Sequence, residues 1–435
     1  MARLGRRGGT TAPGRVLLRL DRRAIERLAP RLGGGVALVS ATNGKTTTAS
    51  MVAGVLEGSG RSVVRNRAGS NMHWGVATAL LEAGRARDEL GLFEVDEAWL
   101  PAVARATAPR ALLLANLFRD QLDRYGELEV LADRWAELVA ELDGRCAFVL
   151  NADDPLVADL GRDRTGVVYF GLADDSQALP DLQHAADSKH CRRCGAAYVY
   201  DAVYLAHMGR YRCPNCGRER PEPEVVAERI ELRGMSGSQV DITTPRGPLS
   251  LTLPLPGLYN VYNAVAATAL SLELGASLDD IRTLEEFAAA FGRVETIPIG
   301  GRDVSILLVK NPAGANEVLR TLALEDGAVD LWLALNDRIA DGRDVSWIWD
   351  ADFEQLAGRV RRATCSGTRA EEMALRLKYA GVDAPIAVER DLGRSLDAAV
   401  EAGDGAPLYA LPTYTALLEL RDLLADRGVA GRWSD

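Results

Sequence analysis

Residues 40–50, SATNGKTTTAS, have the composition of a phosphate-binding loop. A glycine such as Gly44 lets a phosphate oxygen approach the backbone closely, and Lys45 supplies a positive charge beside it. Thr46 offers a hydroxyl to Mg²⁺, and a helix that follows the loop points its positive N-terminus at the anion. The segment therefore predicts a site for ATP and magnesium. The residues expected to contact the phosphates are Thr42, Asn43, Gly44, Lys45, Thr46 and Thr47.

Four of the six cysteines form two C-x₂-C pairs. Their spacing, C-x₂-C-x₁₈-C-x₂-C, is typical of a zinc ribbon in which four thiolates hold one Zn²⁺. Four thiolates complete the tetrahedron and leave no position for water, so we expect a structural zinc and not a catalytic one. The nearby His190 and His207 are expected to be surface histidines. The expected zinc ligands are Cys191, Cys194, Cys213 and Cys216.

The elements around the phosphate loop have the order that such a loop requires. Residues 36–39 predict a buried strand, and residues 46–57 predict a helix. The generic pattern G-x-x-x-x-G-K-[ST] would have glycine at position 39, where this chain has Val39. Apolar runs then alternate with helical stretches, which indicates a parallel α/β sheet that binds ligands at its carboxyl edge. These runs lie at 90–95, 111–116, 146–154 and 166–171, with a helix expected at 122–142.

The alternation is interrupted by the cysteines and then begins again in a second, smaller unit. Strand-like runs lie at 225–234 and 248–257, and a helix is expected at 262–274. Further apolar runs indicate a second α/β domain; they lie at 304–309, 329–335 and 406–412. We therefore expect a basic segment at 1–32, an ATP-binding domain at 33–298 with an insertion at 187–220, and a C-terminal α/β domain at 299–435.

The composition is that of an ordinary globular protein, with 435 residues, 47% of them hydrophobic. The net charge of −10 argues against general binding to nucleic acid. Neither a secretory signal nor an apolar run long enough to cross a membrane is evident, so we expect a cytoplasmic protein with reduced cysteines. The arginine-rich residues 15–32 predict a solvated first helix, or alternatively one that contacts anionic lipid headgroups or a charged substrate.

Six stretches, in order over about 255 residues, resemble the Mur ligase family. T-N-G-K-T is that family's form of the phosphate loop, although the family usually has glycine where Ala41 stands. FEVDEA places Glu94 where the family has a magnesium-binding glutamate. ANLFRDQLDRYG resembles the family's N-x-x-x-D-H-x-D, with Gln121 in place of histidine. NADDP, at 151–155, matches a further turn of the family.

The last two stretches resemble the parts of the family that meet the nucleotide. LPGLYNVYNAVAA implies that Asn260 and Asn263 hold the adenine side of ATP, and FGRVE implies that Arg293 meets the phosphates. The family transfers a phosphoryl group from ATP to a carboxylate, and an amine then attacks the acyl phosphate. Lys45, Mg²⁺ and Arg293 would position the two anions and neutralise their charge.

Two features depart from the amino-acid-adding Mur ligases. The loop begins at residue 41, which leaves no room before it for a domain that binds a UDP-sugar, and the cysteine insertion is additional. Both features, together with VKNPAGANE (309–317), residues 336–354 and LPTYTALLELR (411–421), resemble the MurT subfamily. That resemblance implies amidation of the D-glutamate α-carboxylate in the lipid II stem peptide, at the inner membrane face. The resemblance also implies that ammonia comes from a GatD-like glutaminase subunit in a heterodimer. Cys146 and Cys365 have no glutaminase-like setting, so we do not expect this chain to supply the ammonia itself.

The stretch DVSWIWDADFE, at 344–354, then has two interpretations. Its tryptophans either fill core positions or form a docking edge for the partner. The resemblance implies that an aspartate here completes the partner's Cys-His pair, and we favour Asp350 over Asp344.

Two other strand ends also carry candidates. Lys310, with Asn311 and Pro312, is expected either to face the ATP cleft or to form a plain N-cap turn. Tyr414 and Thr415 are expected on the substrate side of the second sheet.

Two alternatives remain open at this stage. A folylpolyglutamate synthase-like ligase would also have a Mur-like core without the UDP-sugar domain. A non-catalytic ATP-binding scaffold subunit would be consistent with the departures at Val39, Ala41 and Gln121. The intact Lys45, Thr46 and Glu94 favour an active ligase.

Overall fold

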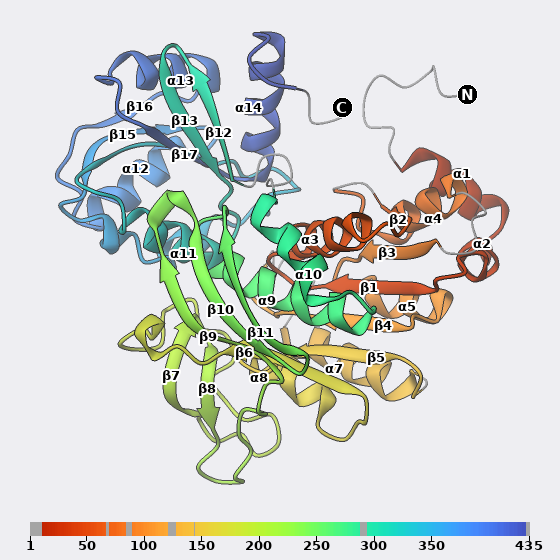
Figure 1. Ribbon diagram of the computed structural model, residues 1–435. Helices are drawn as coiled ribbons and strands as arrows, with labels where there is room; N and C mark the ends of the chain where they lie inside the picture. The colour runs from red at the N-terminus through yellow and green to blue at the C-terminus, as the bar shows by residue number, and fades with distance from the viewer. Residues whose placement is uncertain are drawn as a thin grey trace.

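The computed structural model describes residues 11–66, 69–83, 89–120, 128–142, 144–287 and 294–431. In these residues two helix-covered sheets lie side by side, with the C-terminal sheet forming its own lobe (Figure 1). The first sheet has nine strands in the order β11-β10-β9-β6-β5-β4-β1-β3-β2, and the second has six in the order β12-β13-β17-β14-β15-β16. The fold class expected from the sequence, a parallel ATPase-type sheet followed by a smaller α/β domain, is confirmed.

The centre of the first sheet is β1 (Val36–Ser40), which is buried along its whole length. It pairs in parallel with β3 (Leu90–Glu94) on one side and β4 (Ala111–Leu114) on the other. Helices cover both faces of a sheet of this kind, which is why its strands are continuous apolar runs. The other parallel strands are β2 (Val63–Arg65), β5 (Ala147–Asn151) and β6 (Val167–Leu172), and β9 (Val225–Leu232) joins them to the antiparallel β10 (Ser238–Thr244) and β11 (Gly247–Leu253).

Two hydrophobic cores lie on the two faces of this sheet. On one face α3 (Lys45–Gly58) packs against α9 (Leu258–Glu273), and α9 is buried over most of its length. On the other face lie α4 (His73–Glu82), α5 (Leu100–Thr107) and α7 (Leu128–Glu141). Short helices complete the domain: α8 (Pro155–Ala158), α10 (Leu278–Ile281), η1 (Ala29–Arg31), η2 (Asp159–Gly161), η3 (Asp175–Gln177), η4 (Gly234–Ser236) and η5 (Arg282–Glu286).

The N-terminal segment forms two helices, so the single helix expected over 15–32 is wrong. α1 (Ala12–Leu20) ends at Asp21, which is extended and whose carboxylate accepts a hydrogen bond from the Arg23 amide; α2 (Ala24–Leu28) follows. A local bond of this kind competes with the helical ladder and ends it. α1 packs on α4, where Gly14 donates to the Thr78 hydroxyl at 2.9 Å. Among the described helices, none has the length and apolar character needed to traverse a bilayer.

The cysteine insertion follows β6 and contains a two-stranded hairpin. β7 (Val199–Leu205) and β8 (Met208–Arg212) are antiparallel and project from the nine-stranded sheet (Figure 1).

The second sheet is parallel except at one edge. β12 (Val294–Ile299) is antiparallel to β13 (Arg302–Leu307), so the domain boundary expected between 298 and 299 falls inside β12. The expected apolar runs are β13, β14 (Val329–Ala334) and β17 (Leu408–Pro412), and β15 (Val360–Ser366) and β16 (Ile386–Val388) were not expected. The helices are α11 (Pro312–Leu322), α12 (Ala370–Tyr379), α13 (Leu392–Glu401), α14 (Tyr414–Asp426), η6 (Ser346–Trp349) and η7 (Phe353–Leu356).

Candidate active site

The phosphate loop is shorter than the generic pattern requires. β1 continues to Ser40, so Val39 is a buried strand residue and the loop proper spans only 41–44. The absent first glycine is therefore not needed for a turn. Gly44 is needed, because its φ is +84° and a Cβ there would lie 2.0 Å from Oδ1 of Asn263. α3 begins directly after it, at Lys45.

The loop is held in place by the segment that follows β4. The amide of Asn43 donates to Oδ1 of Asn116 at 2.9 Å, and Nδ2 of Asn116 donates back to the Asn43 carbonyl at 3.0 Å. The Phe118 amide donates to the hydroxyl of Thr42 at 3.0 Å. These bonds fix the loop before a ligand arrives, which is the preorganisation that phosphate binding benefits from.

Lys45 lies folded back over the loop. Its Nζ donates to Glu97 Oε2 at 2.8 Å and also to the Ala41 carbonyl, and its side chain is 10% exposed. Burial opposes the charge of this lysine, but the carboxylates of Glu97 and, farther away, Asp96 and Asp120 outweigh it, so the pKa of Lys45 is raised. Glu97 was not among the predicted site residues, although it belongs to the same FEVDEA stretch as Glu94.

Glu94 ends β3 directly beside the loop strand, because its register partner is Val39. Its Oε2 is buried and has no hydrogen-bond partner among the described residues. Thr46 lies in the first turn of α3, at the carboxyl end of the neighbouring β1. A buried carboxylate oxygen without a partner and a hydroxyl at this edge suit Mg²⁺, which prefers oxygen ligands.

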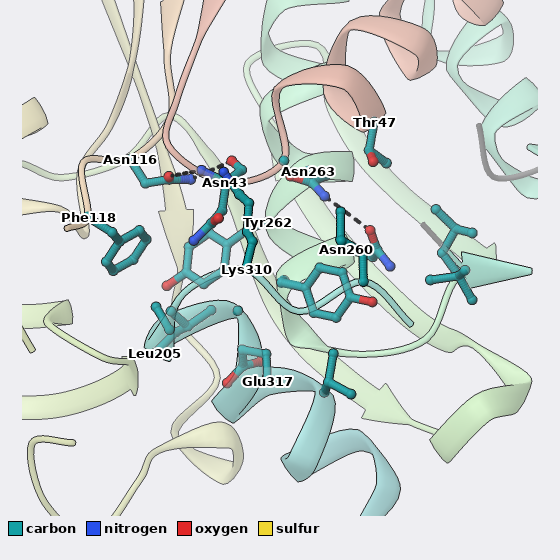
Figure 2. Close-up of a pocket in the computed structure, with 18 of the residues that line it drawn as sticks. Asn43, Thr47, Asn116, Phe118, Leu205, Asn260, Tyr262, Asn263, Lys310 and Glu317 are labelled. Carbon is teal, nitrogen blue, oxygen red and sulfur yellow. Dashed lines mark hydrogen bonds between the residues drawn. The ribbon is translucent and has the colours of Figure 1, made fainter. Parts of the chain in front are cut away.

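A cleft extends from the loop between the two domains (Figure 2). Asn260 and Asn263 lie on its wall in the first two turns of α9, and Nδ2 of Asn263 donates to Oδ1 of Asn260 at 3.0 Å. The rest of the wall is largely apolar, as expected where a nucleoside binds. Its apolar and aromatic members include Phe118, Leu205, Met208, Leu255, Tyr259 and Tyr262.

The cysteine insertion contributes directly to this cleft. Leu205 and Met208, at the turn between β7 and β8, line it. Asp153, from the NADDP stretch, accepts hydrogen bonds from the hydroxyl of Tyr262 at 2.7 Å and from Arg220 at 2.6 Å. The insertion therefore supports a cleft residue through a buried carboxylate.

The second domain closes the cleft over the phosphate loop. Nζ of Lys310 donates to the Thr42 carbonyl at 3.0 Å and to Asp120 Oδ2 at 2.6 Å. The side-chain amides of Asn311 and Asn43 bond each other at 3.0 and 3.3 Å. Asn311 also caps α11 through the Gly314 amide, so this turn is both an N-cap and a cleft-facing element.

The four paired cysteines come together at one point. All four sulfurs lie within 4.8 Å of one another, as a single tetrahedral ion requires. His190 is exposed, but the expectation of a surface position for His207 is wrong. His207 is 0% exposed, with its ring 4.8 Å from that of Phe118 and its Nδ1 accepting from the Asp187 amide at 3.3 Å.

The two remaining cysteines have the environment of core residues. Cys146 and Cys365 are both buried, and burial raises the pKa of each thiol to about 12. A thiol with so high a pKa is a poor nucleophile at neutral pH.

A second hollow lies beside the first and shares Lys310 with it. Asp350 lies on its wall with a side chain that is 45% exposed, 3.5 Å from Arg119. Asp344 lies there too, but its carboxylate accepts the Ser346 amide at 2.8 Å, and this bond lowers its pKa. The carboxylate of Asp350 is therefore more accessible to another molecule than the carboxylate of Asp344.

An exposed aromatic patch adjoins this hollow. Trp349 is 49% exposed and packs edge-on against the exposed Tyr379, with ring centroids 5.8 Å apart. Arg376 lies beneath it, 5.4 Å from the Trp349 ring. Ile348 and Phe353 from the same stretch are buried, so part of it fills core positions, while the docking interpretation stays a prediction.

The remaining candidates do not line either hollow, or they lie outside the described residues. Thr415 is buried and bonded to Asp341, with its amide donating at 2.7 Å, so it fixes the loop after β14. Tyr414 begins α14 and is half-buried. Arg293 and Gln121 lie outside the described residues.

Comparison with known proteins places these features in one family. The Mur ligase middle domain matches residues 39–216, and the MurT ligase C-terminal domain matches residues 308–417. The lipid II isoglutaminyl synthase (glutamine-hydrolyzing) subunit MurT of Staphylococcus aureus is 30% identical over 97% of this chain and 94% of its own length. The corresponding subunit of Streptococcus pneumoniae is 32% identical over 99% of this chain and 95% of its own.

Solved structures show the same fold at lower identity. A pseudomurein peptide ligase type C from Methanothermus fervidus superposes with a TM-score of 0.71 and 21% identity, over 90% of this chain and 79% of its own. The near-complete coverage by MurT subunits, together with the match of the C-terminal domain, decides the assignment. The chain belongs to the MurT family of Mur ligases.

Proposed function

We propose that this chain is the synthetase subunit of a lipid II isoglutaminyl synthase. It uses ATP to amidate the α-carboxylate of D-glutamate in the stem peptide, at the cytoplasmic face of the membrane. The observation that carries the proposal is the meeting of Lys310 and Asn311 with the phosphate loop in one closed cleft. Proteins named as MurT subunits of such a synthase match the chain over nearly its whole length.

The first step is phosphoryl transfer. A carboxylate oxygen of the substrate attacks the γ-phosphorus of ATP, the bond to the bridging oxygen breaks, and ADP leaves. Lys45, released from Glu97, and Lys310 would balance the negative charge of the two anions as they approach. Mg²⁺ held by Glu94 and Thr46 supplies further charge neutralisation when it is bound. The asparagines of α9 would orient the nucleoside.

The second step is amide formation. Ammonia attacks the carbonyl carbon of the acyl phosphate and the C–N bond forms. The C–O bond then breaks, and the leaving phosphate takes up the proton that the nitrogen loses. A neutral ammonia must therefore reach the phosphate end of the cleft. The hollow that Asp350 lines lies next to Lys310, so it is a suitable entry for ammonia.

The source of ammonia would be a glutaminase subunit bound over Trp349 and Tyr379. Exposed tryptophan and tyrosine are the residues that most often anchor protein interfaces. Asp350, exposed next to this patch, could orient a histidine of the partner's nucleophile pair. The chain's own buried cysteines are unsuited to that task because of their raised pKa. The zinc ribbon would have a structural role, because its hairpin lines the nucleotide cleft.

Mass spectrometry of lipid II provides the test. The chain alone, with ATP, Mg²⁺ and ammonium chloride, should lower the mass of lipid II by about one unit, as OH is replaced by NH₂. A chain that hydrolyses no ATP with ammonium, and none with a glutaminase partner present, would instead be a scaffold. Consumption of folate and glutamate in place of lipid II would assign the folylpolyglutamate synthase activity.

A further inference from the structure

Glu317 is the most unusual side chain in the nucleotide cleft. It lies on α11 in the second domain, is 1% exposed and lines the cleft (Figure 2). Neither of its carboxylate oxygens has a hydrogen-bond partner among the described residues. Its nearest ion-pair partner is Arg320 at 3.9 Å, and that guanidinium already donates to the carbonyls of Tyr204 and Gln177 at 3.0 and 2.9 Å.

A buried carboxylate without donors is costly, so proteins keep one only where something supplies the donors. Burial raises the pKa of Glu317 to about 7, although the charge of Arg320 acts in the opposite direction. The closed cleft borders this side chain and offers space for a ligand. A ligand with hydrogen-bond donors would remove the cost.

The position of Glu317 in the cleft indicates which part of a nucleotide it meets. Asn43 and Thr47 mark the phosphate end, whereas Glu317 lies on the opposite wall, on the same side as Leu205 (Figure 2). The nucleoside must extend from the phosphates into this apolar part. An adenine nucleoside carries donors in its exocyclic amine and its ribose hydroxyls, whereas hypoxanthine and guanine present a carbonyl oxygen where adenine has the amine.

We propose that Glu317 recognises the nucleoside of ATP by accepting a hydrogen bond from its exocyclic amine or a ribose hydroxyl, and so determines nucleotide specificity. This inference rests on the ATP site proposed above. When it is ionised, the carboxylate is an acceptor only, so it attracts the amine and repels a carbonyl oxygen at the same position, and binding is therefore compared in a buffer above the raised pKa of Glu317. Hydrogen bonds to a charged group are also stronger than neutral ones, which makes the discrimination large.

Equilibrium binding to the full chain tests the proposal without requiring turnover. Isothermal titration with Mg²⁺ would compare ADP with IDP, which lacks the amine, and ADP with its 2′-deoxy and 3′-deoxy forms. In the wild type we expect ADP to bind about tenfold or more tightly than the analogue that lacks the contacted group. In Glu317→Ala that ratio should fall to about one. The pair of nucleotides whose affinity ratio falls to about one in Glu317→Ala identifies the donor as the amine or the hydroxyl.

Glu317→Gln keeps the packing while removing the charge, and should bind ADP and IDP with similar affinity if the amine is the donor. Glu419→Gln is a matched control, since Glu419 is a half-buried carboxylate of the same domain that pairs with Arg338 outside the cleft. Thermal unfolding would verify that each variant folds. If Glu317→Ala and Glu317→Gln weaken all nucleotides equally, or change nothing, Glu317 is a structural residue and the inference is wrong. If the wild type binds no nucleotide, the proposed function itself fails, and the inference with it.

Discussion

The carboxyl edges of the two sheets differ in how completely their polar side chains are buried and bonded within this chain. At the edge of the nine-stranded sheet, the polar groups of the phosphate loop are buried and bonded to one another through Asn116, Phe118 and Glu97. At the edge of the six-stranded sheet, Asp350 and Trp349 are about half exposed. A preorganised edge suits chemistry that this chain performs alone. An edge with exposed aromatic and acidic groups suits chemistry that another protein completes.

Removing Lys45 tests the first edge and should have the broadest effect, because the reaction should fail with either source of nitrogen. Lys45→Met removes the cation beside the phosphates, so ATP turnover, measured as released phosphate, should fall by roughly 10²–10³-fold or more. Because this change leaves Glu97 buried without its ion-pair partner, Lys45→Met/Glu97→Gln serves as the matched variant. Substantial turnover in both variants would show that the loop lysine is not part of the reaction.

Changing Asp350 tests the second edge. Asp350→Asn keeps the shape but removes the charge, so glutamine hydrolysis by the complex should fall by roughly 10²–10⁴-fold, as when a triad aspartate is lost. Released glutamate would be measured in the reconstituted complex. Asp344→Asn is the control, because Asp344 is bonded to its own backbone turn. A loss with Asp344→Asn but none with Asp350→Asn would assign the role to Asp344.

The aromatic patch should contribute to affinity and not to chemistry. Trp349→Ala removes a half-exposed ring, so the Kd for the glutaminase should rise roughly 30-fold, about 2 kcal/mol. Surface plasmon resonance would measure it. Leu81→Ala removes an equally exposed apolar side chain on α4 of the other domain and should leave the Kd unchanged. Equal weakening by both variants would exclude a specific docking role for Trp349.

A pH dependence of stability is expected at Glu317, on the α11 wall of the cleft between the two edges. Burial raises the pKa of Glu317 to about 7, above its ordinary value. Between those two values the unfolded chain has released its proton while the folded chain retains it, so stability decreases as the pH rises. Without nucleotide, Glu317→Gln should gain stability relative to the wild type by up to about 3 kcal/mol between pH 4.5 and 8. Urea unfolding at several pH values would measure it. A pH-independent difference would place Glu317 in a solvated or well-paired environment.

The sequence predicted the elements whose signals are local. The loop, the strands around it and the cysteine cluster follow from composition and spacing over short stretches, and the structure has them there. Less of the second domain was predicted, since β15 carries Arg361 and Arg362 and does not have the pattern of a buried strand.

Long-range pairings could not be predicted in the same way. Lys45 meets Glu97 only because β1 and β3 are neighbours, and Leu205 reaches the cleft only because the hairpin folds back toward it. Glu317 resembles a solvated helix residue by type, and its burial arises from the docking of α11 against the first domain. Such features depend on how whole elements pack and not on local pattern.

The most direct test of the difference between the two edges is amidation of lipid II by the same reconstituted complex with two sources of nitrogen. With ammonium chloride, Asp350→Asn should amidate at the wild-type rate and Lys45→Met should not amidate. With glutamine, neither variant should give product. Loss of ammonium-supported amidation in Asp350→Asn, with the fold intact, would contradict the assignment of synthetase chemistry to the first edge and glutaminase support to the second.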